Sequence, residues 1–237
     1  MDSGSGSRNG SDLGGPTDIH QADLRPTWRG LFRLLRGFSI NRFWRLGFTP
    51  DPLLSYSVPM QQIQPDQADF LLHGVYLPAL KNEHRITKSI IEAIPKDKGD
   101  YRPDGISKSA LDLAWHIVAT EMRFMDVLPA GEFDFSPRPR PDSIKNSEDV
   151  TAWYTDNFDS HFAKLTNLSN EQLLKIVDFR SIFQLPAVMY LGFVLHHSVH
   201  HRGQLSMYLR PMGAKVPAMY GESFDSAEAR KAAQQNA

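Results

Sequence analysis

Four long segments with apolar residues at helical spacing constrain the fold of this chain most. In each segment, at residues 66–94, 106–128, 146–165 and 186–210, apolar side chains recur every three or four positions. Residues with this spacing lie on one side of an α-helix, so each segment predicts an amphipathic helix. No convincing strand and no internal repeat accompany the segments, and residues 171–184 are ambiguous. The pattern therefore predicts an all-α fold, a four-helix bundle.

Individual residues predict where these helices begin, end or are interrupted. Pro78 has no backbone N–H and clashes with the preceding turn, so it predicts a kink in the first helix. Ser107 and Ser147 are the predicted N-caps of the second and third helices, because a serine oxygen can accept from their first backbone N–H groups. Pro186 suits the first turn of the fourth helix, and Pro211 ends that helix.

The N-terminal part of the chain has a different composition. Residues 1–23 are rich in Gly, Ser and Asp and predict disorder. Residues 24–48 contain six arginines and no acid, and their apolar residues form a stripe on a short helix. Two interpretations stay open: a basic amphipathic segment that contacts a membrane surface or a partner, or upstream sequence translated before a true start at Met60. We therefore predict a disordered or spurious extension over residues 1–59.

Composition excludes several classes of site. The 237-residue chain contains no cysteine, which excludes disulfides, thiolate metal ligands and a cysteine nucleophile. A formal net charge of -1 argues against a general nucleic-acid binder. No apolar run reaches the ~20 residues of a membrane-spanning helix, and the N-terminus lacks the pattern of a secretion signal. We predict a cytoplasmic protein.

Four of the nine histidines lie within six positions of the fourth segment. Because successive residues advance by about 100° around a helix, these four form two pairs. His197 and His201 fall at the edge of the apolar face, where their ring nitrogens can converge on one metal ion. His196 and His200 fall on the outer side and are predicted to be solvated, whereas Val199 is placed within the apolar face.

A histidine pair alone is weak evidence for a metal site, because a histidine at the edge of a core often bonds a backbone carbonyl. His116 is the only histidine of the second segment and lies at the margin of its apolar face. Three neutral imidazoles from two facing helices would leave an open position for water, the pattern of a catalytic metal site. Histidine ligands favour zinc, nickel or iron over magnesium, and the sequence does not choose among the three.

Two charged residues fall where the helices should be apolar. Glu83 and Arg202 lie near the centres of the apolar stripes of the first and fourth segments. Buried charges need partners, so either these two pair with each other or Arg202 pairs with Glu121. A second hypothesis places Glu83 at the metal, as general base or fourth ligand. Gln204 and Tyr208 are further candidates because of their positions on the fourth helix.

Three stretches resemble one family. The stretch "HHSVHHRGQLSMYLRPMGAKVP" resembles the C-terminal signature of the DinB-like (YfiT-like) metalloprotein family, a form of H-x-x-x-H-R-G-Q. "LDLAWHIVATE" resembles its second-helix motif, and "LPALKNEHRITKSIIEAIP" resembles its first helix. The resemblance covers residues 60–221, which we take as the bundle domain, and leaves 1–59 unmatched. Residues 222–237 are predicted to be a flexible C-terminal tail.

This resemblance implies an up-down-down-up bundle, often dimeric, that holds a divalent ion through His116, His197 and His201. Some members of the wider superfamily transfer low-molecular-weight thiols such as bacillithiol. We therefore predict a metal-dependent thiol S-transferase or hydrolase acting on a small-molecule substrate, with Glu83 and Gln204 as candidate catalytic residues. Without a cysteine, the protein would take its thiol from a cofactor. Two alternatives stay open: a non-catalytic, stress-associated metal-binding protein, and ordinary histidines that bind nothing.

Overall fold

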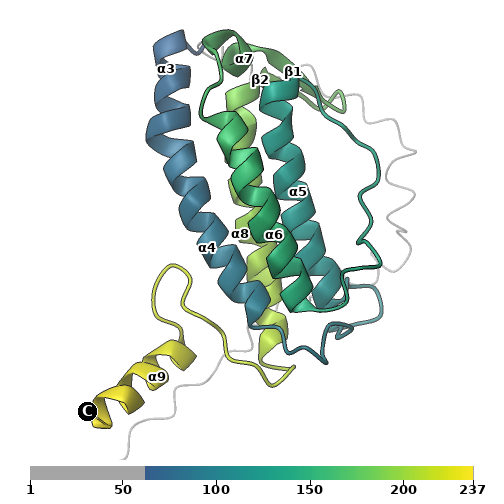
Figure 1. The fold of residues 1–237 in the computed structure, drawn as a ribbon, viewed down its shortest axis with the longest axis vertical. Helices are drawn as coiled ribbons and strands as arrows, with labels where there is room; N and C mark the ends of the chain where they lie inside the picture. The colour runs from purple at the N-terminus through teal and green to yellow at the C-terminus, as the bar shows by residue number, and fades with distance from the viewer. Residues whose placement is uncertain (1–61, 237) are drawn as a thin grey trace, which may run out of the picture. The chain divides into compact units, whose positions relative to one another are not determined.

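The structure, a computed structural model, describes residues 62–236. The predictions for residues 1–59, including the basic segment 24–48, lie outside the described residues. The predicted four-helix bundle is confirmed (Figure 1). Its four helices are α4 (Leu77–Glu92), α5 (Ala110–Ala130), α6 (Ser147–Leu165) and α8 (Tyr190–Leu209). The short helix α3 (Pro65–Phe70) and a π-helical turn (Leu71–Tyr76) lead directly into α4.

The four helices have the up-down-down-up order. In the view of Figure 1, α4 and α8 run downwards, while α5 and α6 run upwards. Helices α4 and α5 each pack against both α6 and α8. Because α5 and α6 are parallel, the connection over residues 131–146 returns along the length of the bundle. Gly131 begins this connection with a φ of 71°, the left-handed conformation that suits glycine at a helix C-terminus.

The core lies between the apolar faces of the four helices. Burying a leucine or isoleucine side chain stabilises the fold by roughly 1.5–3 kcal/mol. Fully buried members from each of the four helices include Leu80, Ile90, Ile117, Leu128, Val150, Leu165, Val194 and Leu205.

Two predicted helix caps are wrong by one or two residues. Ser109, not Ser107, caps α5, because its hydroxyl accepts from the N–H three residues later. Asn146, not Ser147, caps α6 in a capping box. Ser147 is already inside the helix and donates to the carbonyl of Ile94 (2.9 Å), which ties α6 to the end of α4.

The interruption predicted at Pro78 takes the form of a π-helical turn just before it. In this turn the N–H of Leu77 donates to the carbonyl of Leu72, five residues back. The wider turn leaves room for the ring of Pro78 and tolerates the hydrogen bond that this residue cannot donate. The first helix therefore continues through the proline instead of ending there.

A small hairpin precedes α8, although no strand was predicted. After α7 (Asn170–Leu174), strands β1 (Ile176–Phe179) and β2 (Phe183–Pro186) pair antiparallel, with Val177 opposite Leu185. Pro186 therefore ends a strand, and a 3₁₀ turn (Ala187–Met189) leads into α8. The tight turn between the strands places Arg180 and Ser181 at positive φ.

The C-terminal segment also contains an element that was not predicted. Helix α9 (Phe224–Gln235) lies within the predicted tail and begins at Ser223, whose hydroxyl accepts from the N–H of Ser226. Periodicity missed it because its apolar residues are mostly alanines and none of its side chains is buried. Across residues 62–236, no helix combines the length and the apolar character needed to cross a membrane.

Candidate metal centre

Three histidines from two helices meet at one point between α5 and α8. The Nε2 atom of His116, on α5, lies 3.1 Å from Nε2 of His197 and 3.2 Å from Nε2 of His201, both on α8. One ring nitrogen from each residue lies within 4.8 Å of the others. The structure thus brings together all three histidines that the sequence predicted as metal ligands.

The position of this group corrects the predicted apolar face of α8. Val199, placed within that face, is 41% exposed, whereas Tyr190 and Tyr208, which share the side of the helix with His197 and His201, are buried. The buried face is therefore rotated toward the histidine side. As a result His197 and His201 are half-buried, and the outer pair at positions 196 and 200 is exposed, as predicted.

The surroundings keep these imidazoles neutral. Burial, and after it repulsion from the neighbouring rings, lowers the pKa of His197 to about 3 and that of His116 to about 4. Burial also lowers the pKa of His201. Neutral imidazoles carry a lone pair, and one N–H of His116 cannot serve both neighbouring nitrogens at once. A shared cation would satisfy all three lone pairs, so the donor set fits a divalent transition metal.

The other ring nitrogens differ in their contacts. Nδ1 of His201 lies 2.7 Å from Oε1 of Gln204, an oxygen that can only accept, so the proton of His201 is on Nδ1 and the lone pair on Nε2. Nδ1 of His116 lies 3.5 Å from the hydroxyl of Thr120. Nδ1 of His197 is buried without a hydrogen-bond partner among the described residues. Gln204, a predicted site residue, thus contacts a histidine of the group.

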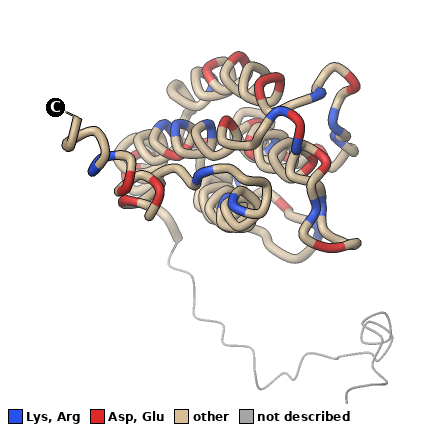
Figure 2. Tube along the Cα trace, turned by 90° about the horizontal axis from the view of Figure 1, so that it is seen from below, with Lys and Arg blue, Asp and Glu red and all other residues tan. Residues whose placement is uncertain are grey.

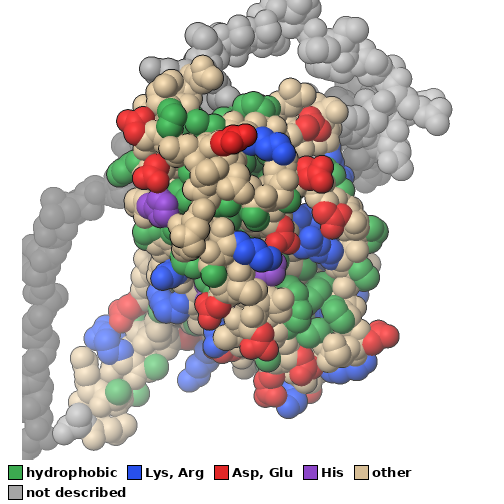
Figure 3. All heavy atoms as spheres, turned by 45° about the horizontal axis from the view of Figure 1, so that its top comes forward, with side chains coloured by type: hydrophobic (Ala, Val, Ile, Leu, Met, Phe, Trp, Pro, Cys, Tyr) green, Lys and Arg blue, Asp and Glu red, His purple; other side chains and the backbone are tan. Residues whose placement is uncertain are grey.

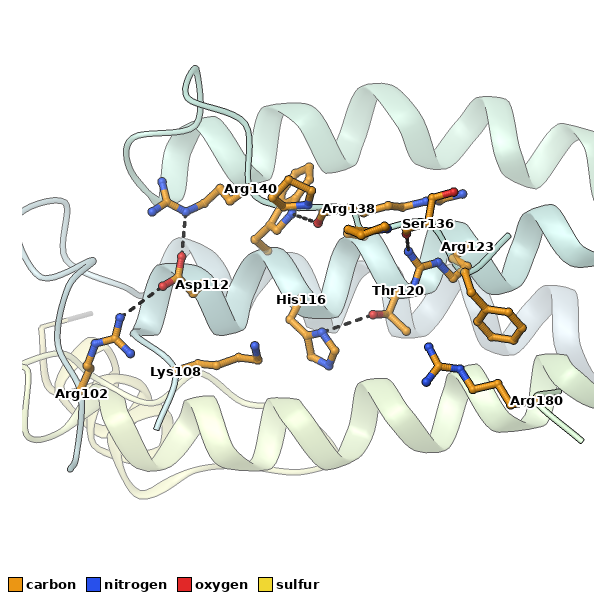
Figure 4. Close-up of a pocket in the computed structure, with 15 residues that line it drawn as sticks. Arg102, Lys108, Asp112, His116, Thr120, Arg123, Ser136, Arg138, Arg140 and Arg180 are labelled. Atoms are coloured by element: carbon orange, nitrogen blue, oxygen red, sulfur yellow. Dashed lines mark hydrogen bonds and ion pairs between the residues drawn. The ribbon is translucent and has the colours of Figure 1, made fainter. Parts of the chain in front are cut away.

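A cavity of about 610 Å³ lies beside this group, with His116 in its wall (Figure 4). One wall is α5, and the opposite wall is the returning connection between α5 and α6, from Phe135 to Arg140. Arg102 and Lys108, from the loop before α5, and Arg180, from the hairpin, complete it. No local sequence pattern predicted this cavity, because residues far apart in the chain form it and only the fold brings them together.

The other predicted site residue, Glu83, lies in a different network. Its carboxylate forms an ion pair with Arg202 and accepts from Tyr220 (2.6 Å), and Arg202 also donates to the hydroxyl of Thr87 (3.0 Å). The prediction that Glu83 and Arg202 pair with each other is confirmed. Glu83 does not belong to the three-histidine group and does not line the cavity.

Glu121 and Tyr208 also lie outside the three-histidine group. Glu121 accepts from Tyr154 (2.6 Å) and from Ser198 (3.1 Å) and does not pair with Arg202 at ion-pair distance. The ring of Tyr208 packs edge-on against Tyr101.

The fold and the site define a class: four-helix bundles whose facing helices present three histidines to one point beside a cavity. The chain belongs to the DinB family, whose family model matches residues 67–235. The protein YjoA of Bacillus subtilis (strain 168) is 29% identical over 133 residues, which cover 55% of this chain and 84% of YjoA.

Solved structures share the fold. The DinB-like protein YjoA of Bacillus subtilis aligns with a TM-score of 0.51 at 24% identity, over 62% of this chain and 99% of that one. A DinB-like protein of Bacillus cereus ATCC 10987 aligns with a TM-score of 0.52 at 19% identity, over 61% of this chain and 95% of that one. At these identities the likeness concerns the fold alone.

Proposed function

We propose that this protein binds a divalent transition metal and uses it as a metal-dependent thiol S-transferase or hydrolase on a small molecule. The observation that carries the proposal is the convergence of three neutral Nε2 atoms at a point bordering a cavity of about 610 Å³. Three protein ligands are typical of catalytic zinc sites, which keep one position for water or substrate. Structural sites usually take four protein ligands.

Each residue of the group has a defined part in this proposal. His116, His197 and His201 would hold the ion, and His116 also faces the cavity through which a substrate enters. The bound ion would act as a Lewis acid that lowers the pKa of a water or thiol in its open position. Gln204 is a positioning residue, because its bond to Nδ1 of His201 keeps the metal-binding lone pair on Nε2.

The chain has no thiol of its own, so a thiol reaction requires a low-molecular-weight thiol as co-substrate. The thiol would lose its proton to solvent water, and the thiolate would attack an electrophilic carbon of the second substrate, from which the leaving group would depart with the bonding electrons and take up a proton from water. We assign Glu83 a structural part instead of that of general base, because Arg202 and Tyr220 already occupy its carboxylate.

The first test is the metal content of the full chain, purified without chelator or metal-affinity resin and measured by elemental analysis. We expect one transition ion per wild-type chain and none in His201→Ala. His196→Ala is the matched control, since it removes an exposed histidine of the same helix and should keep the ion. Gln204→Met should bind the ion about 10–100-fold more weakly, whereas Gln204→Glu, which keeps the acceptor oxygen, should restore most of the affinity.

The outcomes separate the three sequence-based hypotheses. An ion in wild type together with turnover of a thiol and an electrophile, lost in His201→Ala, supports the enzyme. An ion without turnover for any thiol and electrophile pair supports a non-catalytic metal-binding protein. If wild type holds no ion even after incubation with zinc, nickel or iron, the metal proposal is wrong.

A further inference from the structure

The cavity beside His116 contains a local excess of positive charge. Its lining has six cationic side chains and one carboxylate, and these are Arg102, Lys108, Arg123, Arg138, Arg140, Arg180 and Asp112. The chain as a whole has a formal net charge of -1. Along the backbone trace in Figure 2, and over the face drawn in Figure 3, acidic and basic side chains are interspersed. The excess is therefore a property of the cavity.

Three of the six cations already have carboxylate partners. Asp112 lies 3.0 Å from Arg140 and 3.5 Å from Arg102. Arg138 lies 3.6 Å from Asp126, which is outside the cavity lining. The pairs of Arg138 and Arg140 hold the returning connection against α5, and that of Arg102 holds the loop before α5, so these charges are largely neutralised within the protein.

The other three cations have no carboxylate at ion-pair distance among residues 62–236. Arg123 donates to the backbone carbonyl of Ser136 (2.6 Å), while its Nε is buried without a partner. The guanidinium of Arg180 lies over the ring of Phe135, 4.6 Å from its centre. Lys108 is exposed toward the cavity and makes no ion pair with a described residue. Like charges gathered without counter-ions destabilise a fold, so a role in binding accounts for their presence.

These three cations flank the candidate metal centre. Figure 4 shows Lys108 on one side of His116 along α5, and Arg123 and Arg180 on the other side. They come from three separate parts of the chain: the loop before α5, α5 itself and the turn of the hairpin. A ligand held by them would therefore lie against His116.

We propose that Lys108, Arg123 and Arg180 bind an oxyanion group, a carboxylate or a phosphate, on the small-molecule substrate. This assignment names the substrate class of the metal centre and in that respect rests on the proposed function. Guanidinium groups bind carboxylates and phosphates through paired, charge-assisted hydrogen bonds. The anion would be fixed beside the ion while the rest of the molecule presents its reactive atom at the open position.

The cavity favours a small molecule over a nucleic acid. Its volume of about 610 Å³ lies within the roughly 300–1,000 Å³ that is usual for small-ligand sites. Nucleic-acid binding would require a basic stripe continuing over the surface, and the formal net charge of -1 for the whole chain argues against one.

The test is calorimetric titration of the full chain with inorganic phosphate and, separately, with succinate at constant ionic strength. The variant is Lys108→Gln combined with Arg180→Asn, since asparagine tolerates the left-handed backbone at position 180. Arg85→Gln combined with Lys145→Gln is the matched control, because it removes the same charge from exposed positions outside the cavity. We expect at least tenfold weaker anion binding in the cavity variant and unchanged binding in the control.

A parallel titration of His201→Ala separates this inference from the metal proposal. Anion binding that persists in His201→Ala and weakens in the cavity variant supports the cationic site, whether or not the chain holds a metal. The inference is overturned if the cavity variant binds like the control, or if binding disappears only in His201→Ala, because the anion would then sit on the ion itself. Tighter binding of a single-stranded oligonucleotide than of either small anion would also overturn it. Whichever of phosphate and succinate binds more tightly identifies whether the site prefers a phosphate or a carboxylate group.

Discussion

At the scale of single residues, the most unusual group is a carboxyl buried in the centre of the bundle. Glu121 is 1% exposed and accepts hydrogen bonds from Tyr154 and Ser198. Burial raises its pKa to about 7, and it does so against the two hydrogen bonds and the positive charge of Arg202, which favour the ionised form. The carboxyl is therefore protonated at a pH where it would be ionised in the unfolded chain.

This pKa predicts that Glu121 destabilises the protein as the pH rises. Its ordinary pKa of 4.5 governs the unfolded chain and about 7 the folded one, so its stabilising contribution is present below 4.5 and is lost as the pH rises through 7. We expect Glu121→Gln, which cannot ionise, to gain about 2–3 kcal/mol relative to wild type between pH 5 and pH 8. Urea unfolding of both proteins across this range measures the difference.

The comparison with wild type also provides the control. Other groups that change protonation between pH 5 and pH 8 are present in both proteins, so their contributions cancel in the difference. If the difference in unfolding free energy between Glu121→Gln and wild type were constant from pH 5 to pH 8, the carboxyl would not be perturbed.

At the scale of elements, periodicity predicted the long helices well because each buries one continuous face. Periodicity did not predict the hairpin, because the strongest sequence signal for a hairpin is the pair of residues in its turn. A hairpin turn whose two central residues both have positive φ normally carries Asn-Gly or Asp-Gly, and in this three-residue loop (180–182) Arg180 and Ser181 have that conformation. The alternating apolar residues from Ile176 to Leu185 were the remaining signal, and they did not distinguish a strand from a helix segment.

For the candidate site too, the sequence predicted what depends on local spacing and not what depends on tertiary packing. The spacing of His197 and His201 on one helix is local information, so the sequence was sufficient to pair them. The cavity depends on the packing of the connection after α5 and of the hairpin, and no local pattern encodes that packing. Glu83 illustrates the limit: its buried charge was evident from the sequence, but only the structure shows that Arg202 and Tyr220 are its partners.

The strain in the hairpin turn leads to a stability prediction. Serine at a φ of 57° lies in the left-handed region that glycine adopts without steric cost. Ser181→Gly should therefore raise the free energy of unfolding by about 0.5–1 kcal/mol, after allowance for the greater freedom of glycine in the unfolded chain. Ser181→Val, whose branched side chain suits this conformation badly, should lower it. Thermal unfolding of the two variants checks the prediction, and equal melting temperatures would contradict it.

At the scale of the whole molecule, one polar network joins three parts of the chain through the core. Arg202, on α8, is 1% exposed and bonds the carboxylate of Glu83 and the hydroxyl of Thr87 on α4. Tyr220, from the segment after α8, donates to the same carboxylate. The network fixes how α4 lies against α8, the helix that carries two of the three histidines. It therefore stabilises the position of the helix that carries His197 and His201, through residues that do not line the cavity.

The last prediction distinguishes this structural part of Glu83 from a part in the chemistry. Glu83→Gln leaves a buried guanidinium without its counter-ion and should lower the free energy of unfolding by about 3 kcal/mol. Glu83→Leu combined with Arg202→Met, which removes both charges, should recover much of that loss. Metal content should stay at the wild-type value in both variants, as measured by elemental analysis beside urea unfolding. Loss of the ion from a Glu83→Gln protein of undiminished stability would instead place Glu83 at the metal, because a residue that only holds two helices together cannot release the ion without weakening the fold.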